Sequence, residues 1–350
     1  MKICFFIPGF SNGGAQKQCI KLLNQLSLNY ELEIHLMYFY EGISFHELNL
    51  ERINLNKLNF ISFYDPRNIM YANRMVREIQ PNILFSWLHS CDVYSYFVKK
   101  LNPEIKWVMA ERDSYYPDQI KYNIRCLLGK KSDLIIANSN KGKKYWKGLG
   151  VDEKKIIVVE NILSEALEYD ANVVIDNRTT IAFAGRFEDQ KNILLTTKLF
   201  CKLSVEFPDY RFLLIGEGSR LAEVSDLIKN TRVEIVPYQK NIISLFNSID
   251  VFVNLSKHEG KPNTVIENIA CKSIVVVSDI EEHREILGDE YNFYIDTSRH
   301  ENDIFFEISE LISKLNDFVY DTDYKYAHQV LKKMLPQRVC KDYTDIFMSL

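Results

Sequence analysis

The sequence predicts an α/β protein with two domains, each built around a parallel β-sheet. Three observations predict this fold class. Short apolar runs alternate with amphipathic segments, this alternation runs through the chain twice, and the chain has 350 residues. Strand-like runs separated by helical segments of ~10–15 residues are typical of parallel sheets. A chain of this length exceeds one ordinary domain and suffices for two.

The first half alternates in this way over residues 1–162, which we assign to a first domain. Its short apolar runs predict strands at 2–7, 32–39, 82–87, 106–110, 133–137 and 155–159. Its amphipathic segments predict helices at 15–28, 68–80, 90–101, 119–130 and 140–148.

The second half repeats the pattern over residues 180–335, after a polar and poorly periodic linker at 163–179. A last segment, 336–350, follows a proline and is expected to form a helix that packs back toward the first domain. The predicted strands lie at 180–184, 211–215, 232–236, 250–254, 273–277 and 291–295. The predicted helices lie at 192–206, 219–229, 241–247, 263–271 and 301–316.

Composition excludes several classes of protein. The net charge of −4 argues against a globally basic nucleic-acid binder. The seven cysteines are scattered, without zinc-binding or disulfide spacing, as in a reduced cytoplasmic protein. No apolar run approaches the ~20 residues of a membrane-spanning helix, and Pro8 and Gly9 end the short run at the N-terminus.

Two glycine-containing loops follow predicted strands. Gly13 and Gly14 precede a helix, where their backbone N–H groups would approach an anionic or polyol ligand; a tight strand-to-helix turn is the alternative. Gly216 and Gly218 resemble half of a dinucleotide-binding fingerprint, but Leu221 stands where its third glycine belongs. This loop therefore favours a nucleotide over a nicotinamide cofactor.

A third loop, Gly185 to Asn192, carries two cations five residues apart. Arg186 offers a planar fork for phosphate, and Lys191 offers a point charge. Both would reach an anion at the start of the helix that follows. A solvated turn is the alternative.

The fourth loop follows the apolar strand at 250–254 and combines two carboxylates with a helix N-terminus. Glu259 lies in the loop, and Glu267 lies one turn into the helix that starts near Pro262 or Asn263. Carboxylates accept hydrogen bonds from sugar hydroxyls, and the free N–H groups of a helix N-terminus bind anions. Two solvated surface glutamates are the alternative for this pair alone.

Taken together, these loops resemble the donor domain of retaining GT-B glycosyltransferases of family 4. The resemblance rests on Arg186 and Lys191, then Gly216 and Gly218, then the Glu-x7-Glu signature of Glu259 and Glu267, and more loosely on Gly13-Gly14-Ala15 and Val159-Glu160-Asn161. It implies two Rossmann-like domains that face a central crevice. The first would bind the acceptor, and the second would bind a nucleotide-sugar donor.

The resemblance also implies roles for individual residues. Arg186 and Lys191 would bind the donor diphosphate, Glu259 would contact the sugar, and Glu267 would bind the ribose. No metal and no other cofactor is implied, because the cations and the helix end stabilise the leaving diphosphate. The other donor-binding residues implied are Gly13, Gly14, Gly185, Gly216, Gly218, Val236, Pro237, Tyr238, Gly260, Lys261, Pro262, Asn263 and Thr264.

The chain departs from the family at one place in the first domain. Many members have a histidine after the strand at 106–110, where this chain has Glu111 and Arg112. His89, at the end of the preceding predicted strand, is a further candidate. These three residues are the candidates for an acid, a base or another polar catalytic group.

Basic residues gather between residues 121 and 147, where Asp133 is the only acidic residue. Such a face suits an anionic bilayer or a diphosphate-bearing lipid, and a merely solvated face is the alternative. The cluster consists of Lys121, Arg125, Lys130, Lys131, Lys141, Lys143, Lys144 and Lys147.

The expected activity is transfer, with retention, of a hexose or N-acetylhexosamine from a nucleotide diphosphate sugar, expected to be a UDP-sugar. The expected acceptor is a lipid-linked oligosaccharide of bacterial surface polysaccharide biosynthesis, such as O-antigen of lipopolysaccharide, or capsule. The enzyme would be cytoplasmic and peripheral on the inner face of the membrane, with no nucleic-acid partner. A nucleotide-sugar epimerase of the same architecture and a non-catalytic sugar-binding module are the alternatives.

Overall fold

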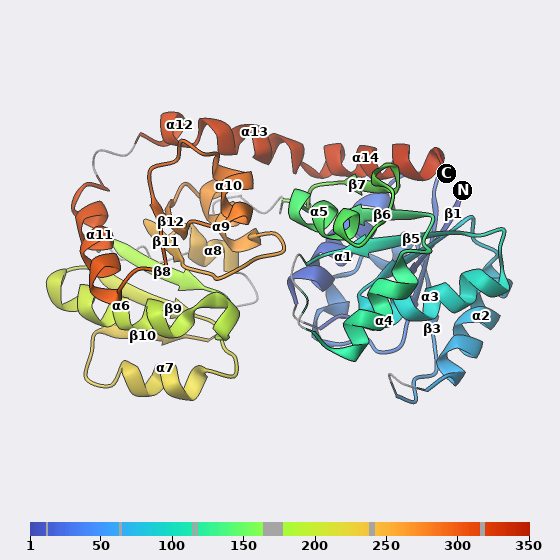
Figure 1. The fold of residues 1–350 in the computed structure, drawn as a ribbon, viewed down its shortest axis with the longest axis horizontal. Coiled ribbons are helices and arrows are strands. Elements are labelled where there is room, and N and C mark those ends of the chain that lie inside the picture. The colour runs from blue at the N-terminus through green and yellow to red at the C-terminus, as the bar shows by residue number, and fades with distance from the viewer. Residues whose placement is uncertain are drawn as a thin grey trace. The chain divides into compact units, whose positions relative to one another are not determined.

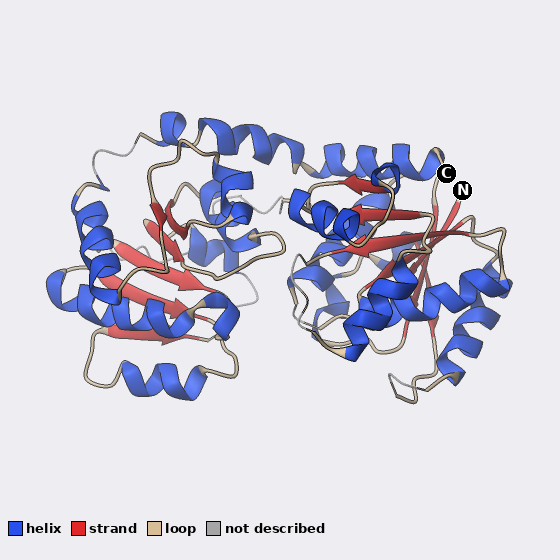
Figure 2. Ribbon diagram, in the orientation of Figure 1, coloured by secondary structure: helices blue, strands red, loops and turns tan. Residues whose placement is uncertain are grey.

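The computed structural model describes residues 1–11, 13–62, 65–113, 116, 118–163, 178–237, 242–315 and 319–350. The chain divides into two compact units (Figure 1). Unit 1 comprises Met1–Ile162 and Lys333–Leu350, and unit 2 comprises Leu163–Lys332. Each unit holds one parallel β-sheet with helices on both of its faces (Figure 2), which confirms the predicted fold class.

The sheet of unit 1 has seven strands in the order β3-β2-β1-β4-β5-β6-β7. All neighbouring strands run parallel. The strands are β1 (Lys2–Phe6), β2 (Glu33–Tyr38), β3 (Ile53–Lys57), β4 (Ile83–Trp87), β5 (Lys106–Glu111), β6 (Leu134–Ala137) and β7 (Ile156–Val158).

One strand of this sheet, β3, was not predicted from the sequence. Its residues Ile-Asn-Leu-Asn-Lys are mostly polar, and only Ile53 is buried. A strand at the edge of a sheet has a neighbour on one side alone, so it needs no continuous apolar run. The apolar-run criterion therefore missed it.

Five helices cover the sheet of unit 1, together with a helix from the end of the chain. The helices are α1 (Gly14–Leu26), α2 (Arg67–Ile79), α3 (His89–Leu101), α4 (Ile120–Gly129), α5 (Asn140–Gly148) and α14 (Pro336–Met348), with short 3-10 turns at Ile43–Glu47, Leu50–Arg52 and Glu153–Lys155. Helix α14 packs against α1. Its Tyr343 and Phe347 rings lie 6.0 and 5.6 Å from the ring of Phe85 in β4, between centroids.

The sheet of unit 2 has six parallel strands in the order β10-β9-β8-β11-β12-β13. The strands are β8 (Thr180–Ala184), β9 (Arg211–Ile215), β10 (Val233–Val236), β11 (Val251–Asn254), β12 (Ile274–Ser278) and β13 (Tyr294–Ile295). The helical elements are η4 (Asp189–Lys191), α6 (Ile193–Glu206), α7 (Leu221–Leu227), α8 (Ile242–Phe246), α9 (Asn263–Ala270), α10 (Glu281–Leu287), α11 (Glu301–Ser313), α12 (Tyr320–Asp323) and α13 (Lys325–Lys333).

The strand order of unit 2 places three of the candidate loops together. The order reverses between β8 and β11, which are neighbours in the sheet although they are far apart in the chain. The loops that follow the strands on either side of such a reversal leave the sheet in opposite directions and open a site at its carboxyl edge. The loops after β8, β9 and β11 lie at this edge.

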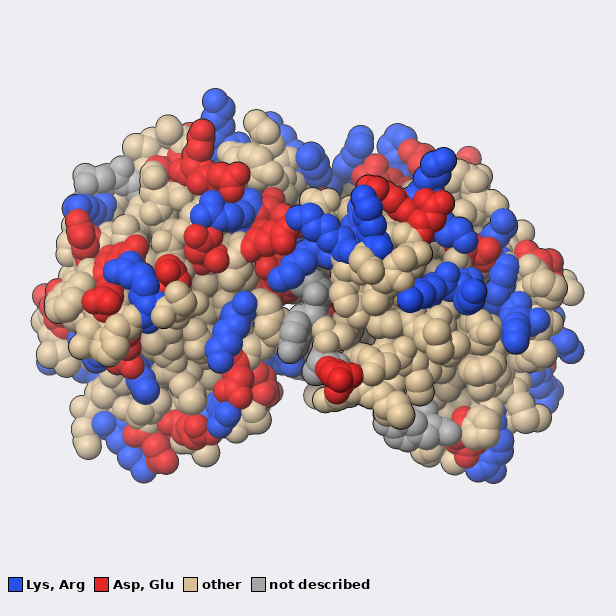
Figure 3. Space-filling view, in the orientation of Figure 1, with Lys and Arg blue, Asp and Glu red and all other residues tan. Residues whose placement is uncertain are grey.

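The surface of both units carries charged side chains of both signs (Figure 3), as the nearly balanced composition requires. Among the described residues, no helix is long and apolar enough to cross a membrane.

Candidate active site

A buried ion pair joins the loops after β8 and β11. The Lys191 Nζ lies 2.6 Å from the Glu259 Oε1, and the two side chains are 13% and 5% exposed. Lys191 ends the η4 turn after β8, and Glu259 lies in the loop after β11. The pairing of β8 with β11 brings together these residues, which are 68 positions apart.

Further contacts hold Glu259 in place. The Ser256 hydroxyl donates to the Glu259 Oε1 over 2.8 Å, and the backbone N–H of Glu259 donates to the Glu282 Oε1 over 2.9 Å. His283, fully buried beside this loop, contacts the Ser278 carbonyl oxygen through Nδ1 at 2.8 Å. Sequence reasoning missed Glu282 and His283, because they belong to the short helix α10, which was not predicted.

The protonation of this cluster follows from its surroundings. Burial raises the pKa of the Glu259 carboxyl, but the charge and hydrogen bond of Lys191, together with His283 and the Ser256 hydroxyl, bring the pKa below its usual value. Burial lowers the pKa of His283, in spite of the nearby Glu259 charge. Near neutral pH the Glu259 carboxyl is therefore an anion, and His283 is uncharged.

The charge of Glu259 predicts how a Lys191→Met variant responds to pH. Removing one partner of a buried ion pair costs about 3–5 kcal/mol at neutral pH, because the other charge stays buried. In the wild type, the low pKa of Glu259 contributes stability above its unfolded value of about 4.3, and this stability is lost as pH falls below it. In Lys191→Met the buried carboxyl has a raised pKa and takes up a proton at higher pH, so the cost of the substitution is expected to shrink from pH 7 toward pH 5.

Urea unfolding at several pH values measures this difference. The double variant Lys191→Met with Glu259→Gln, which leaves no buried charge, is the control and is expected to unfold with little of this pH dependence. A cost of Lys191→Met that stays constant from pH 7 to pH 5 would contradict the assignment of a buried, charged Glu259.

Arg186 lies in the same loop as Lys191 but is exposed. Its Nη2 donates to the Gln190 Oε1 over 3.0 Å. Gln190 in turn links the two loops, because its Nε2 donates to the His258 carbonyl oxygen over 3.1 Å and its own carbonyl oxygen accepts from the Lys257 backbone N–H over 2.9 Å. Gln190 is a residue that sequence reasoning missed, although it stands between the two predicted cations.

The glycines after β9 allow two loops to approach each other closely. Gly216 has φ +140°, and a Cβ there would lie 2.0 Å from the Gly185 carbonyl oxygen. A Cβ on Gly218 would lie 2.5 Å from the Phe187 carbonyl oxygen. Backbone hydrogen bonds from Gly185 to Ile215 and from Phe187 to Glu217 hold the loops together. The paired glycines therefore let the loop after β9 pack directly on the loop that carries Arg186 and Lys191.

Helix α9 begins beside Glu259. Its first residue is Asn263, and Gly260, Lys261 and Pro262 connect it to Glu259. The Thr264 hydroxyl is buried and makes no hydrogen bond within the part of the chain that the structure describes. Glu267 is half-buried in the next turn, where its charge raises the pKa of the half-buried Cys271 thiol further than burial alone. Val236 ends β10 and Pro237 follows it, whereas Tyr238 lies outside the described residues.

Residues 167–315 match the family model "Glycosyl transferases group 1". The match covers less than half of the chain and lies within unit 2. A related N-acetylgalactosaminyltransferase of Campylobacter jejuni, which acts on N-acetylgalactosamine-N,N'-diacetylbacillosaminyl-diphospho-undecaprenol, is 25% identical over 333 residues, 87% of this chain and 88% of the relative.

Solved structures agree with the GT-B fold. The chain matches Anabaena HepE in complex with UDP and glucose with a TM-score of 0.84 at 15% identity, over 100% of both chains. It matches the lipopolysaccharide outer core galactosyltransferase WaaB with a TM-score of 0.72, also at 15% identity and over 100% of both chains. These structures show the fold, two Rossmann-like domains. The family match and the relatives identify the protein as a glycosyltransferase.

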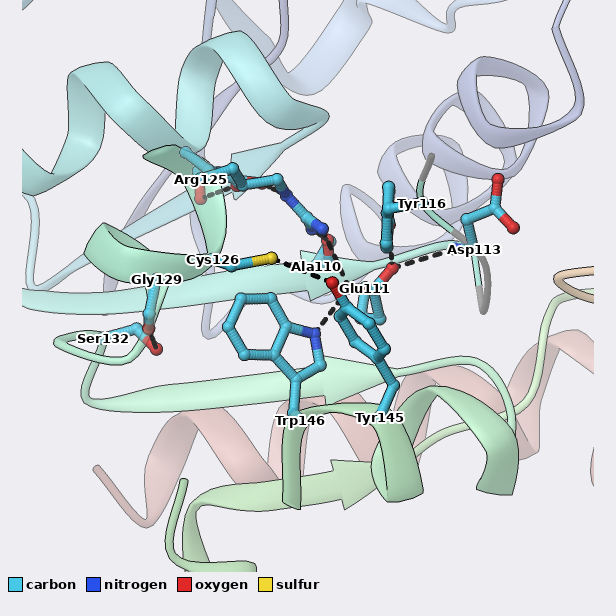
Figure 4. A network of polar contacts seen from close by, with 12 residues as sticks. Ala110, Glu111, Asp113, Tyr116, Arg125, Cys126, Gly129, Ser132, Tyr145 and Trp146 are labelled. Carbon is cyan, nitrogen blue, oxygen red and sulfur yellow. Dashed lines mark hydrogen bonds and ion pairs between the residues drawn. The ribbon is translucent and has the colours of Figure 1, made fainter. Parts of the chain in front are cut away.

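In unit 1 of this glycosyltransferase, the candidate Glu111 is the centre of a buried hydrogen-bond network (Figure 4). Its carboxylate accepts from the Trp146 Nε1 over 2.5 Å, from the Arg125 Nη1 over 3.0 Å and from the Asp113 backbone N–H over 2.9 Å. The Tyr116 hydroxyl donates to the same carboxylate. With four donors around it, Glu111 holds the end of β5 to α4 and α5.

The other two candidates of unit 1 lie apart from this network. The Arg112 guanidinium stacks 3.9 Å from the Trp87 ring centroid and donates to the Tyr343 hydroxyl over 2.6 Å and to the Asn161 Oδ1 over 3.1 Å, so it ties α14 to the sheet. His89 opens α3 after Leu88, which has φ +73°, a strained conformation for leucine. Burial and the nearby Lys121 lower the pKa of His89, so it is uncharged at neutral pH.

The two glycines of the first loop lie at the N-terminus of α1. Gly13 precedes the helix, and its carbonyl oxygen accepts from the Lys17 backbone N–H over 3.0 Å. Gly14 is the first residue of the helix.

The structure corrects the expected basic cluster at Arg125. This side chain is 2% exposed and pairs with two buried carboxylates, those of Asp92 and Glu111. The sequence did not reveal these partners, because they lie 33 and 14 positions away in other elements. On α5, Lys143 and Lys147 pair with Glu153, so the surface there is less positive than the residue count indicates.

Proposed function

We propose that this glycosyltransferase transfers a hexose or N-acetylhexosamine from a UDP-sugar to a lipid-linked oligosaccharide, with retention of configuration. The observation that carries the proposal is the buried pair of Lys191 and Glu259 at the carboxyl edge of the unit 2 sheet, directly before the N-terminus of α9. A cation, a carboxylate and the N-terminus of a helix at one place suit a sugar bound through a diphosphate.

The roles divide along this site. Arg186, Lys191 and the first turn of α9 bind the diphosphate, and Glu259 contacts the sugar. Glu267, one turn into α9, binds the ribose hydroxyls. Val236 and Pro237 lie near the base, and the glycines of the loop after β9 line the nucleotide site.

The names of the relatives support a lipid-linked acceptor. Three relatives from Campylobacter jejuni, at 21–25% identity, are N-acetylgalactosaminyltransferases that act on undecaprenol-diphosphate-linked sugars. By analogy, unit 1 binds such an acceptor, and the enzyme works at the cytoplasmic face of a bacterial membrane in surface polysaccharide assembly, as for O-antigen or capsule.

A thermal-shift screen with UDP-, GDP- and ADP-sugars tests the donor. A ligand at 100 times its dissociation constant stabilises the folded protein by about 2.7 kcal/mol. We expect the largest shift with a UDP-sugar, and an equal or larger shift with a GDP- or ADP-sugar would contradict this donor.

Product analysis separates the proposal from the two alternatives. A transferase releases UDP from its donor, slowly to water when no acceptor is present. An epimerase changes the sugar without releasing UDP, and a binding module does neither. The two cations proposed to bind the donor diphosphate, Arg186 and Lys191, favour the transferase over the binding module.

Full activity is expected to survive EDTA, because Arg186, Lys191 and the α9 N-terminus offset the charge of the leaving diphosphate. The Asp321-Thr322-Asp323 triplet resembles a metal-binding motif, but the Asp323 Oδ2 accepts from the Val319 backbone N–H over 2.8 Å. Replacing both aspartates with alanine is expected to cost at most about 1 kcal/mol of stability. Loss of activity in EDTA with rescue by manganese or magnesium would overturn this expectation.

A further inference from the structure

Helix α4 exposes an apolar stripe. Ile120, Ile124 and Leu127 are 79%, 42% and 66% exposed. Their spacing of four and then three residues places all three on one face of the helix. A helix on a soluble domain ordinarily turns such a stripe toward the core.

The reason for this orientation lies on the opposite face of α4, whose buried residues are Arg125 and Gly129. The Arg125 Nε lies 2.6 Å from the Asp92 Oδ2, and its Nη1 lies 3.0 Å from the Glu111 Oε2 (Figure 4). A Cβ on Gly129 would lie 2.7 Å from the Trp146 ring, so the helix packs closely there. A buried ion-pair network thus fixes the rotation of α4 with its apolar stripe outward.

Lysines stand at both ends of the stripe. Lys121 follows Ile120 at the start of the helix, and its Nζ lies 4.7 Å from the centroid of the Tyr122 ring. Lys130 and Lys131 follow the last turn, and both are exposed. Figure 3 shows an area without charged side chains over α3 and α4, with lysine or arginine side chains along its upper border. Apolar side chains between lysines complement the boundary of an anionic bilayer, which offers acyl chains beneath negative headgroups.

We propose that this α4 face, defined by Ile120, Ile124, Leu127, Lys130 and Lys131, docks onto an anionic lipid bilayer. The helix lies in the plane of the interface, where the three apolar side chains enter the headgroup–acyl boundary and the lysines contact anionic headgroups. Ten residues of helix are about 15 Å long, which suits a helix that lies on a membrane and not one that spans it. The docking itself is argued from α4 and does not depend on the proposed function. It rests on the proposed function only for its purpose, which is to give the enzyme access to a lipid-linked acceptor.

Vesicle co-sedimentation without donor or acceptor tests the docking separately from catalysis. The full-length protein is mixed with vesicles of phosphatidylcholine alone or with added phosphatidylglycerol. We expect the wild type to bind the anionic vesicles and not the neutral ones. The variant Ile120→Ser, Ile124→Ser, Leu127→Ser is expected to bind the anionic vesicles at least ~10-fold more weakly, because burial of apolar side chains drives interfacial binding.

A matched control removes exposed apolar side chains elsewhere. Val205 in α6 and Phe306 in α11 are 80% and 66% exposed, and both belong to unit 2. The variant Val205→Ser, Phe306→Ser is expected to bind vesicles like the wild type. Unchanged UDP-sugar thermal shifts in both variants would show that the fold is intact.

The lysines account for the salt-sensitive part of the affinity. Each lysine near an anionic surface raises the affinity for it about five-fold. The double variant Lys130→Gln, Lys131→Gln is therefore expected to bind anionic vesicles roughly 25-fold more weakly at low salt, and the loss is expected to be far smaller at high salt.

Two results would overturn the proposal. The first is wild-type vesicle binding by the triple serine variant. The second is a wild-type dimer in sedimentation velocity that the triple variant loses, because a second copy of the chain would then cover the α4 face. A failure of catalysis with intact vesicle binding would instead count against the proposed function alone.

Discussion

Replacing Lys191 with alanine is expected to lower turnover by at least ~100-fold, the scale of losing one preorganised group that stabilises developing charge. Lys191 is held at the carboxyl edge of the sheet by Glu259, 2.6 Å away, so under the proposed function it would meet the donor diphosphate without reorganising. Arg186→Ala is expected to have an effect of the same size. Steady-state rates at saturating donor measure both.

Lys198→Ala is the matched control for this prediction. Lys198 lies in α6, seven residues after Lys191, and its half-exposed side chain pairs with Glu301 on the surface of the same unit. Its loss is expected to leave turnover within about two-fold, since exposed ion pairs contribute little. Wild-type rates in Lys191→Ala and Arg186→Ala would refute their assignment to the diphosphate.

Replacing Glu259 with glutamine is expected to lower kcat by about 100-fold with a much smaller change in donor affinity. The carboxylate is oriented by the Ser256 hydroxyl and Lys191, and Glu282 fixes its backbone. If Glu259 contacts the sugar, as proposed, its charge contributes most when positive charge develops on that sugar in the transition state.

Glu267→Gln separates the two carboxylates of the signature. If Glu267 holds the ribose, its replacement is expected to raise the dissociation constant of the nucleotide and to change kcat less. Calorimetric titration with UDP, beside rate measurements, distinguishes the two effects. Wild-type rates and affinities in both variants would contradict the assignment of the donor site.

Local patterns predicted much of the fold and of the candidate site. The apolar runs indicated twelve of the thirteen described strands of the two sheets, because buried parallel strands are apolar on both faces. The spacing of glycines, cations and glutamates indicated the loops after β8, β9 and β11. The mostly polar strand β3 and the short helix α10, with Glu282 and His283, carry no such signal and were missed.

The sequence-based prediction was wrong about Arg125, which it placed in an exposed basic cluster. A sequence shows that an arginine stands among lysines, but it does not show which of them turns inward. Asp92 and Glu111 neutralise Arg125 inside unit 1, and this buried pairing leaves Ile120, Ile124 and Leu127 on the surface. Polarity alone would have placed the charge outside and the apolar stripe inside.

The class of the fold and the resemblance to a family follow from local sequence patterns, because strand and helix periods and loop motifs are properties of neighbouring residues. Which charges meet depends instead on how the folded chain packs. Lys191 finds Glu259 across 68 positions, and Arg125 finds Asp92 across 33. Such pairs depend on strand order and helix rotation, which are set by the packing of the whole unit and not by any short stretch of chain.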